Sequence, residues 1–376
     1  MIYLDYAANH PVDPAVLARF CAVERAFIGN PNAAHPAGQA AKAEMGRITS
    51  SISALLGAQP SEVIYTSGAT EANNLALQGL ALTGRHTGRH ILSTPLEHAS
   101  VGRCLDHLQA QGYEVDLLQL RPDGTVDLAQ LEALLRTDTI LVAVCAVDSE
   151  LGTIQPLRQI QELLKRYPGC RLHVDATQAV GRIPISFSGI DTLSLSLHKL
   201  GGLNGSGLLL KRQNLTLAPL FHGGTGASIY RSGTPTLALA AAAECALRLA
   251  LEQMPARSRC IDARQKQLSA GLSAYPRVTL NTPPSAAAHI LNLSVQGVKG
   301  TRFQRALSER GVCVSVRSAC STDGAPSRAV FALCQDRRRA LCAWRVSLSH
   351  LTTASDIQGF LAAFEICYRD LAAADV

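Results

Sequence analysis

Between residues 62 and 212, the sequence alternates short runs of strand-forming residues with segments that show the period of an α-helix. A strand-like run at 91–93 precedes one such helical segment, and a run at 115–120 precedes another at 128–135. This alternation is typical of βαβ units, in which helices join parallel strands and cover the sheet. The sequence therefore predicts an α/β fold with a large, mostly parallel sheet and helices on both faces.

Polar residues follow several of the predicted strands. We expect further strands at 140–147, 171–174 and 192–197, and each of these runs ends in a polar cluster. Ligands of open α/β sheets bind in the crevice at the carboxyl ends of the strands. The polar residues at these strand ends are therefore the candidates for binding and catalysis.

A second, smaller region is predicted after the sheet. An alanine-rich helix at 236–252 is followed by a predicted connector at 253–264. Strands near 289–295 and 311–316 and a final helix at 355–371 then indicate an α+β region with its own core.

The length of the chain fits two unequal domains. It has 376 residues, of which 47% are hydrophobic and 17% charged, so it can bury more than one core. We expect a large domain at 12–255 and a small domain formed by 1–11 together with 256–376.

Composition excludes several classes of protein. The first five residues, Met1-Ile2-Tyr3-Leu4-Asp5, lack the pattern of a signal peptide, and no later run has the apolar length of a membrane helix, so we expect a cytoplasmic protein without membrane association. The eleven cysteines show neither CxxC pairs nor metal-ligand spacing, which argues against a disulfide framework and against a metal site. A net charge of +6 permits an acidic partner, but direct nucleic-acid binding is not indicated.

Three motifs lie at predicted strand ends. Ser67-Gly68-Ala69-Thr70-Glu71 follows the strand at 63–65 and opens a helix, which suits a bound phosphate, although Thr70 as a simple helix N-cap is the alternative. Asp175 follows the strand at 172–174 and could hold a positively charged ring nitrogen, or else cap a helix or form an ion pair.

Lys199 ends the third motif, Ser196-Leu197-His198-Lys199, in front of a glycine-rich turn. A partly buried lysine at this place could form a Schiff base, whereas an exposed lysine would be structural. A phosphate cradle, an acid for a pyridinium nitrogen and a lysine for an aldehyde are together what pyridoxal 5'-phosphate (PLP) requires.

The ordered set of motifs resembles the NifS/IscS-like cysteine desulfurases, within the class V branch of fold-type I PLP enzymes. The resemblance covers nearly the whole chain, from Leu4-Asp5-Tyr6-Ala7-Ala8 through Gly29-Asn30-Pro31-Asn32 to Arg345-Val346-Ser347-Leu348. It implies conversion of L-cysteine to L-alanine by a homodimer that passes the sulfur to an acceptor protein.

The resemblance also implies a role for each matching residue. Lys199 would bind the cofactor aldehyde, Asp175 would pair with the ring nitrogen, and His98 would stack on the ring and shuttle a proton. Gln178 would bond the phenolic oxygen. The phosphate would be held by Ala69, Thr70, Ser196 and His198, with Thr234 from the second subunit, and the substrate carboxylate would be held by Asn32 and Arg345.

Cys320 is the predicted sulfur acceptor. It lies among small, polar and basic residues in Arg317-Ser318-Ala319-Cys320-Ser321-Thr322-Asp323-Gly324, where a thiol ionises more readily than in an apolar run. The segment also resembles the catalytic-cysteine loop of the family in its long-loop form, which would let a persulfide reach a partner.

The sequence departs from the family pattern at several positions. Asp148 stands where an asparagine is expected beside the phenolic oxygen, so we expect it to raise the pKa of the cofactor's Schiff base relative to Asp148→Asn. Leu197, Arg317 and the pair Asn9-His10 are further departures, which favour a specialised acceptor pathway such as DNA phosphorothioation or tRNA thiolation over general iron–sulfur assembly.

Two other functions fit the same motifs. Another class V enzyme, such as an aminotransferase or a selenocysteine lyase, would use Lys199 and Asp175 without needing Cys320. An inactive scaffold for sulfur-relay partners would need none of the three.

Overall fold

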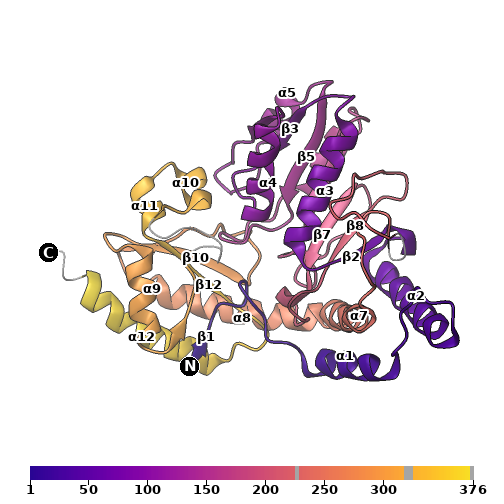
Figure 1. Cartoon of the computed structure of the whole chain (residues 1–376). Coiled ribbons are helices and arrows are strands. Elements are labelled where there is room, and N and C mark those ends of the chain that lie inside the picture. Colours follow the sequence, from indigo (N-terminus) through magenta and orange to yellow (C-terminus); the bar gives the residue numbers. More distant parts are fainter. Residues whose placement is uncertain (225–227, 317–324, 373–376) are drawn as a thin grey trace.

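The computed structural model describes residues 1–224, 228–316 and 325–372. Its largest element is a seven-stranded sheet in the order β2-β8-β7-β6-β5-β3-β4 (Figure 1). The strand β8 is antiparallel to both of its neighbours, and all other pairs are parallel. The strands are β2 (Val63–Thr66), β3 (His90–Ser93), β4 (Glu114–Leu117), β5 (Thr139–Cys145), β6 (Arg171–Asp175), β7 (Thr192–Ser196) and β8 (Gly207–Lys211).

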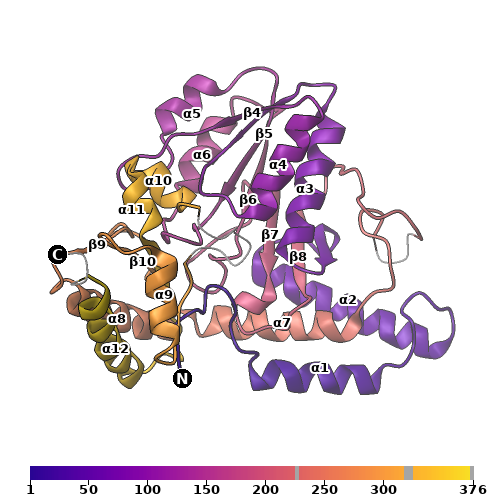
Figure 2. The ribbon, with the colours of Figure 1, turned by 60° about the vertical axis from the view of Figure 1, so that its left-hand side comes forward.

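Helices cover both faces of this sheet, so the predicted α/β class is confirmed (Figures 1 and 2). One face carries α3 (Ala69–Gly84) and α4 (Ala99–Ala110), whose apolar residues form a common cluster with the strands. Apart from Arg171 at the start of β6, every residue of the central strands β5 to β8 is buried, as expected for strands covered on both sides. The opposite face carries α1 (Pro14–Ala26), α2 (Pro36–Leu56), α5 (Leu128–Leu134), α6 (Leu157–Leu164) and α7 (Leu237–Glu252).

The second region has its own sheet and core. β10 (Ile290–Val295) lies between β9 (Val278–Leu280) and β12 (Ala343–Ser347), antiparallel to both. The N-terminal strand β1 (Ile2–Tyr3) pairs in parallel with β11 (Val312–Cys313), so the first residues of the chain lie in this region. Its helices are α8 (Met254–Leu272), α9 (Gly300–Ser308), α10 (Arg328–Cys334), α11 (Arg337–Leu341) and α12 (Ala354–Ala372).

The predicted connector at 253–264 is wrong, because Gln253 is the N-cap and 254–264 form the first part of the 19-residue helix α8. Pro255 lies in the first turn of this helix, where proline is tolerated. The helix buries only Ile261, Leu268 and Leu272, so its apolar stripe is too sparse to be recognised in the sequence.

Within the described ranges, no helix combines the length and the hydropathy needed to cross a membrane. The ten cysteines in those ranges are free thiols.

Candidate active site

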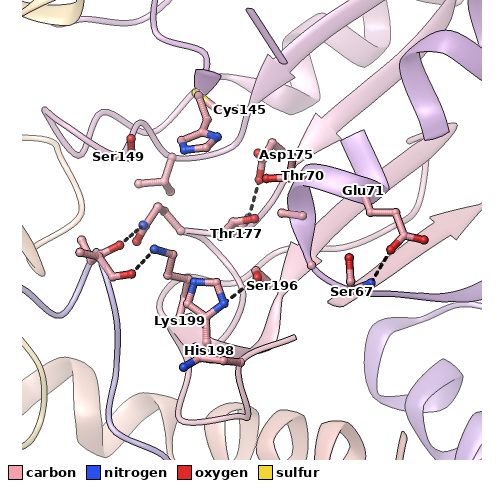
Figure 3. Close-up of a pocket in the computed structure, with 18 of the residues that line it drawn as sticks. Ser67, Thr70, Glu71, Cys145, Ser149, Asp175, Thr177, Ser196, His198 and Lys199 are labelled. Carbon is pink, nitrogen blue, oxygen red and sulfur yellow. Dashed lines mark hydrogen bonds between the residues drawn. The ribbon is translucent and has the colours of Figure 1, made fainter. Parts of the chain in front are cut away.

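A cavity of about 430 Å³ lies at the carboxyl ends of β5, β6 and β7 (Figure 3). Parallel strands end together at this edge, so residues far apart in the sequence meet there. Arg345 of β12 closes the cavity from the second region. Nine of the predicted site residues line it: Ala69, Thr70, His98, Asp175, Gln178, Ser196, His198, Lys199 and Arg345.

Lys199 follows β7 in a short 3₁₀ turn, Leu197–Lys199, and its Nζ donates a hydrogen bond to the carbonyl oxygen of Ala8 (Figure 3). Burial lowers the pKa of this amine to about 8, and the positive charges of Arg345 and Arg182 act in the same direction. At pH 7 about one-tenth of the amine is therefore unprotonated and nucleophilic, far more than for a lysine of ordinary pKa.

Asp175 ends β6 and lies almost completely buried at the cavity wall. Its Oδ1 accepts a hydrogen bond of 2.9 Å from the backbone N–H of Thr177, and its Oδ2 accepts one of 2.8 Å from Asn73 Nδ2. Asn73 lies in α3 and was not identified in the sequence, where it stands beside the motif without any signal of its own.

His98 caps the N-terminus of α4 and lines the cavity. Its Nδ1 accepts a hydrogen bond of 3.1 Å from the backbone N–H of Ser100, and Ser100 Oγ lies 2.9 Å from the same nitrogen. Burial lowers the pKa of this imidazole, and the positive charges of Lys199 and Arg328 lower it further, although Asp175 opposes them.

The opposite end of the cavity has the features of an anion site. The N-cap of helix α3 is Gly68, which has no side chain to accept hydrogen bonds from the first N–H groups of the helix. Ser196 Oγ lies 2.9 Å from His198 Nδ1, and both residues line the cavity beside Thr70 (Figure 3). An uncapped helix N-terminus with adjacent hydroxyl groups suits a phosphate.

Arg345 is 1% exposed and joins the two parts of the chain. Its Nη1 donates to the carbonyl oxygen of Ser149 at 2.6 Å, and its Nη2 contacts Asp5 Oδ1 at 2.9 Å. Ser315 Oγ donates to the other oxygen of Asp5 at 2.7 Å. This bond fixes the Asp5 carboxylate, which in turn orients the guanidinium of Arg345.

Gln178 lines the cavity, but its side chain is already bonded elsewhere. Its Nε2 donates to the carbonyl oxygen of Ala7 at 2.9 Å, and its Oε1 contacts Arg182 Nη1 and, at 3.3 Å, His289 Nε2. Both ends of this amide therefore make hydrogen bonds to residues of the protein.

Asp148, Asn32 and Thr234 do not line the cavity. The buried carboxylate of Asp148 accepts hydrogen bonds from the backbone N–H groups of Glu150 and Leu151 within its own turn, and its expected effect on the cofactor's pKa stays a prediction. The side chain of Asn32 is exposed. Thr234 lines a second cavity of about 370 Å³, which shares Ser67 and Gly205 with the first.

Cys320, together with the rest of 317–324, lies outside the described residues. The sequence suggested no role for Cys145, Thr177 and Ala8, which also line the cavity, or for Asp5, which pairs with Arg345. Their positions depend on how the N-terminal segment and the strand ends meet, which no local pattern encodes.

The family model described as Aminotransferase class-V matches residues 2–360. The cysteine desulfurase IscS of Proteus mirabilis is 36% identical over 365 residues, covering 95% of this chain and 90% of that protein. A solved NifS-like protein has a TM-score of 0.91 at 32% identity, with 97% of this chain and 98% of that chain covered. A structure described as SspA in complex with cysteine has a TM-score of 0.82 at 29% identity, with 94% and 100% covered.

The fold and the site define an enzyme of the fold-type I PLP-dependent class. Within that class, the chain belongs to the aminotransferase class-V family, on the branch of the NifS/IscS cysteine desulfurases.

Proposed function

We propose that this protein is a PLP-dependent cysteine desulfurase that converts L-cysteine to L-alanine and collects the sulfur on Cys320 as a persulfide. One observation carries the proposal: a single cavity brings together Lys199 with a lowered pKa, Asp175, His98 and Arg345. The relatives of the chain are named cysteine desulfurases over nearly its whole length, which supports the same activity.

The residues around the cavity fit PLP. The hydroxyl of Thr177 is buried at the cavity wall and makes no hydrogen bond within the described residues, so it is free for a ligand. A Cβ on Gly207 would lie 2.4 Å from the Cα of Gly68, so only a glycine lets β8 approach the start of α3 this closely. The donor set combines a nucleophilic amine, a carboxylate and an anion site, which matches an aldehyde, a ring nitrogen and a phosphate.

In this arrangement each part of the cofactor would have its own partner. Lys199 would bind the aldehyde, Asp175 the ring nitrogen, and His98 the face of the ring. Ala69, Thr70, Ser196 and His198 would hold the phosphate, and Thr234 would reach it from a partner subunit of a homodimer. When bound, PLP supplies an electron sink that weakens the bonds at the α-carbon of an amino acid.

The substrate would be oriented by its carboxylate. Arg345 is a planar donor whose Nε is buried without a hydrogen-bond partner in the described part of the chain, so the guanidinium keeps donor capacity for a second carboxylate. Lys199, once released, lies at the cavity wall with a pKa near 8 and can accept the α-proton.

Sulfur transfer would be completed by Cys320. Its thiolate attacks the sulfur of the substrate, an S–S bond forms as the Cβ–S bond breaks, and the electron pair stays with the three-carbon product, which leaves as alanine after protonation. A sulfur-acceptor protein then takes the persulfide sulfur, and we propose that this happens in the cytoplasm.

The visible spectrum of the purified protein, with and without L-cysteine, tests the proposal together with its intact mass. A yellow protein that changes colour, produces alanine and gains one sulfur atom supports it, provided that Cys320→Ala loses the added sulfur and Lys199→Ala loses the colour change. A yellow protein that never gains sulfur would instead be another class V enzyme. A colourless protein that PLP does not tint would be an inactive scaffold.

A further inference from the structure

Asn73 of α3 lies fully buried behind the cavity and makes hydrogen bonds through both ends of its side-chain amide. Its Nδ2 lies 2.8 Å from Asp175 Oδ2 and 2.8 Å from Ser100 Oγ. Its Oδ1 lies 3.0 Å from His173 Nε2 and accepts a further bond from Ser194 Oγ. Since an amide can donate two hydrogen bonds and accept two, this group is saturated.

The orientation of this amide follows from its neighbours. An ionised carboxylate only accepts hydrogen bonds, so Asp175 requires Nδ2 and not Oδ1 of Asn73 to face it. A flipped amide would set two acceptors against each other in a dry site, which is costly. His173 agrees with this orientation, because Thr192 Oγ1 lies 2.9 Å from its Nδ1 and can donate there, which leaves the Nε2–H to donate to Asn73.

The second N–H of Asn73 extends the chain of hydrogen bonds to His98. Because Ser100 Oγ accepts from Asn73, its own hydrogen is free to donate to His98 Nδ1, 2.9 Å away. The backbone N–H of Ser100 also donates to this nitrogen. Two donors facing Nδ1 place the proton of the neutral ring on Nε2, the nitrogen that is left for the cavity.

We propose that Asn73 is a positioning residue that joins Asp175 to His98: one N–H holds the carboxylate as an acceptor, and the other, through Ser100, holds the imidazole as its Nε2–H tautomer. Both groups would contact the cofactor or the substrate, so the inference rests on the proposed function. The amide thus connects the group that would stabilise a protonated ring nitrogen with the group that would donate a proton. A buried, saturated network of this kind keeps its geometry because no member can turn alone.

Asn73→Asp tests the proposal, because it keeps the size of the side chain and the acceptor for His173 and Ser194 but removes at least one of the two donors. Two carboxylates would then lie side by side, so we expect the dissociation constant of PLP to rise about tenfold or more, as for the loss of a charge-assisted hydrogen bond. In PLP-free protein labelled with ¹⁵N-histidine, we expect the ring nitrogen signals of His98 to shift.

Two further variants separate the parts of the network. Ser100→Ala should shift the His98 signals while PLP affinity stays within about threefold, since the bond between Asn73 and Asp175 remains. Asn281→Asp makes the same chemical change at an equally buried amide that donates to Asn292 and Ser294 and does not line the cavity, so it should alter neither readout. Equal effects from Asn73→Asp and Asn281→Asp would overturn the proposal, as would a folded Asn73→Asp protein with unchanged affinity and unchanged His98 signals.

If Asn73→Asp does not fold, ¹⁵N-asparagine labelling of the otherwise unchanged protein replaces it. The two amide protons of Asn73 should respond separately, one to Ser100→Ala and the other to PLP. A pair that responds to neither overturns the proposal. A wild-type protein that binds no PLP contradicts the proposed function instead, whereas the His98 spectra of PLP-free protein test Asn73 independently.

Discussion

Lys199 has a pKa lowered to about 8 by burial and by the nearby cations, so its reactivity should follow pH in a defined window. We expect the rate of PLP uptake by PLP-free protein to rise about tenfold per pH unit well below 8 and to level off above it, because only the neutral amine attacks an aldehyde. Stopped-flow absorbance measures this rate. Arg345→Gln removes the second-largest cause of the shift and should move the midpoint upward; a midpoint near that of free lysine in the wild type would contradict the expectation.

Asp148 is buried, and its pKa is raised to about 7, by burial and then by the charge of Glu150. Between the ordinary carboxyl pKa of 3.8 and about 7, the unfolded carboxyl group is ionised while the folded one holds its proton, so the free energy of unfolding falls as pH rises through this window. Across this window the free energy of unfolding of the wild type should therefore fall by at most about 4 kcal/mol relative to that of Asp148→Asn. Above the window, the two curves of free energy against pH should run parallel.

Denaturant unfolding at several pH values measures this difference. Glu150→Gln serves as the companion variant. Without the neighbouring charge, the pKa of Asp148 should be lower, so the free energy of unfolding should depend on pH over a narrower range. Curves for the wild type and Asp148→Asn that run parallel from pH 4 to 7 would mean that Asp148 is not buried as described.

At the residue scale, the sequence was sufficient for those candidates whose position follows from a strand end. Asp175, Ser196 and Lys199 lie directly after or at the end of β6 and β7, so the βαβ pattern alone brings them together. Asn73 and Asp5 could not be found in this way. They act through contacts with residues far away in the chain, and a buried amide or a loop carboxylate has no local pattern.

At the element scale, the start of α3 depends on a close approach between Gly68 and Gly207. A Cβ at position 207 would lie within 2.4–2.8 Å of three backbone atoms of Gly68, so the backbone must move. We expect Gly207→Ala to destabilise the fold by about 1–3 kcal/mol, as overpacking does. PLP affinity should fall about tenfold with the loss of one phosphate contact.

Calorimetry and PLP titration check both effects. Gly46→Ala is the matched control, because a Cβ there meets nothing within 4 Å in the helix α2, and it should stabilise the protein by about 0.5–1 kcal/mol. If Gly207→Ala behaved like Gly46→Ala, the anion site would not depend on this contact.

Strands with apolar runs were easier to predict from the sequence than a mostly polar helix. Strands with apolar runs were located within a few residues, for instance β6 and β10. The helix α8 was missed because most of its residues are polar and only three are buried, so tertiary packing against α12 rather than periodicity fixes it.

At the scale of the whole molecule, the N-terminal segment connects the second region with the active site. Asp5 pairs with β12 through a bridge to Ser347, Ala8 accepts the hydrogen bond from Lys199, and the backbone N–H of His10 donates to the carbonyl oxygen of His198. The division into a small domain of 1–11 with 256–376 stays a prediction. The contacts of Ala8 and His10 make the geometry around Lys199 depend on how the two regions meet.

His10 and His350 lie at this junction with their rings stacked at 5.6 Å. Ser349 Oγ lies 2.9 Å from His10 Nε2 and 3.3 Å from His350 Nδ1. Burial lowers the pKa of His350 to about 4, with Arg257 and His10 lowering it further and Asp13 opposing them, and burial also lowers the pKa of His10. The junction is therefore built for neutral imidazoles.

A base whose pKa is depressed on folding stabilises the folded state above its unfolded pKa, and this stability is lost as the pH falls through the interval between the two values. For His350 the interval runs from 6.5 to about 4. Because the ring is only half-buried, solvent screening reduces the effect, and we expect a loss of about 1–2 kcal/mol that His350→Gln abolishes. Thermal unfolding across this range, with His107→Gln on the exposed side of α4 as the control, measures it. The free energy of unfolding of His350→Gln should fall less steeply with decreasing pH than that of the wild type and of His107→Gln. If all three fell equally, protonation of His350 would not be a cause of the acid sensitivity.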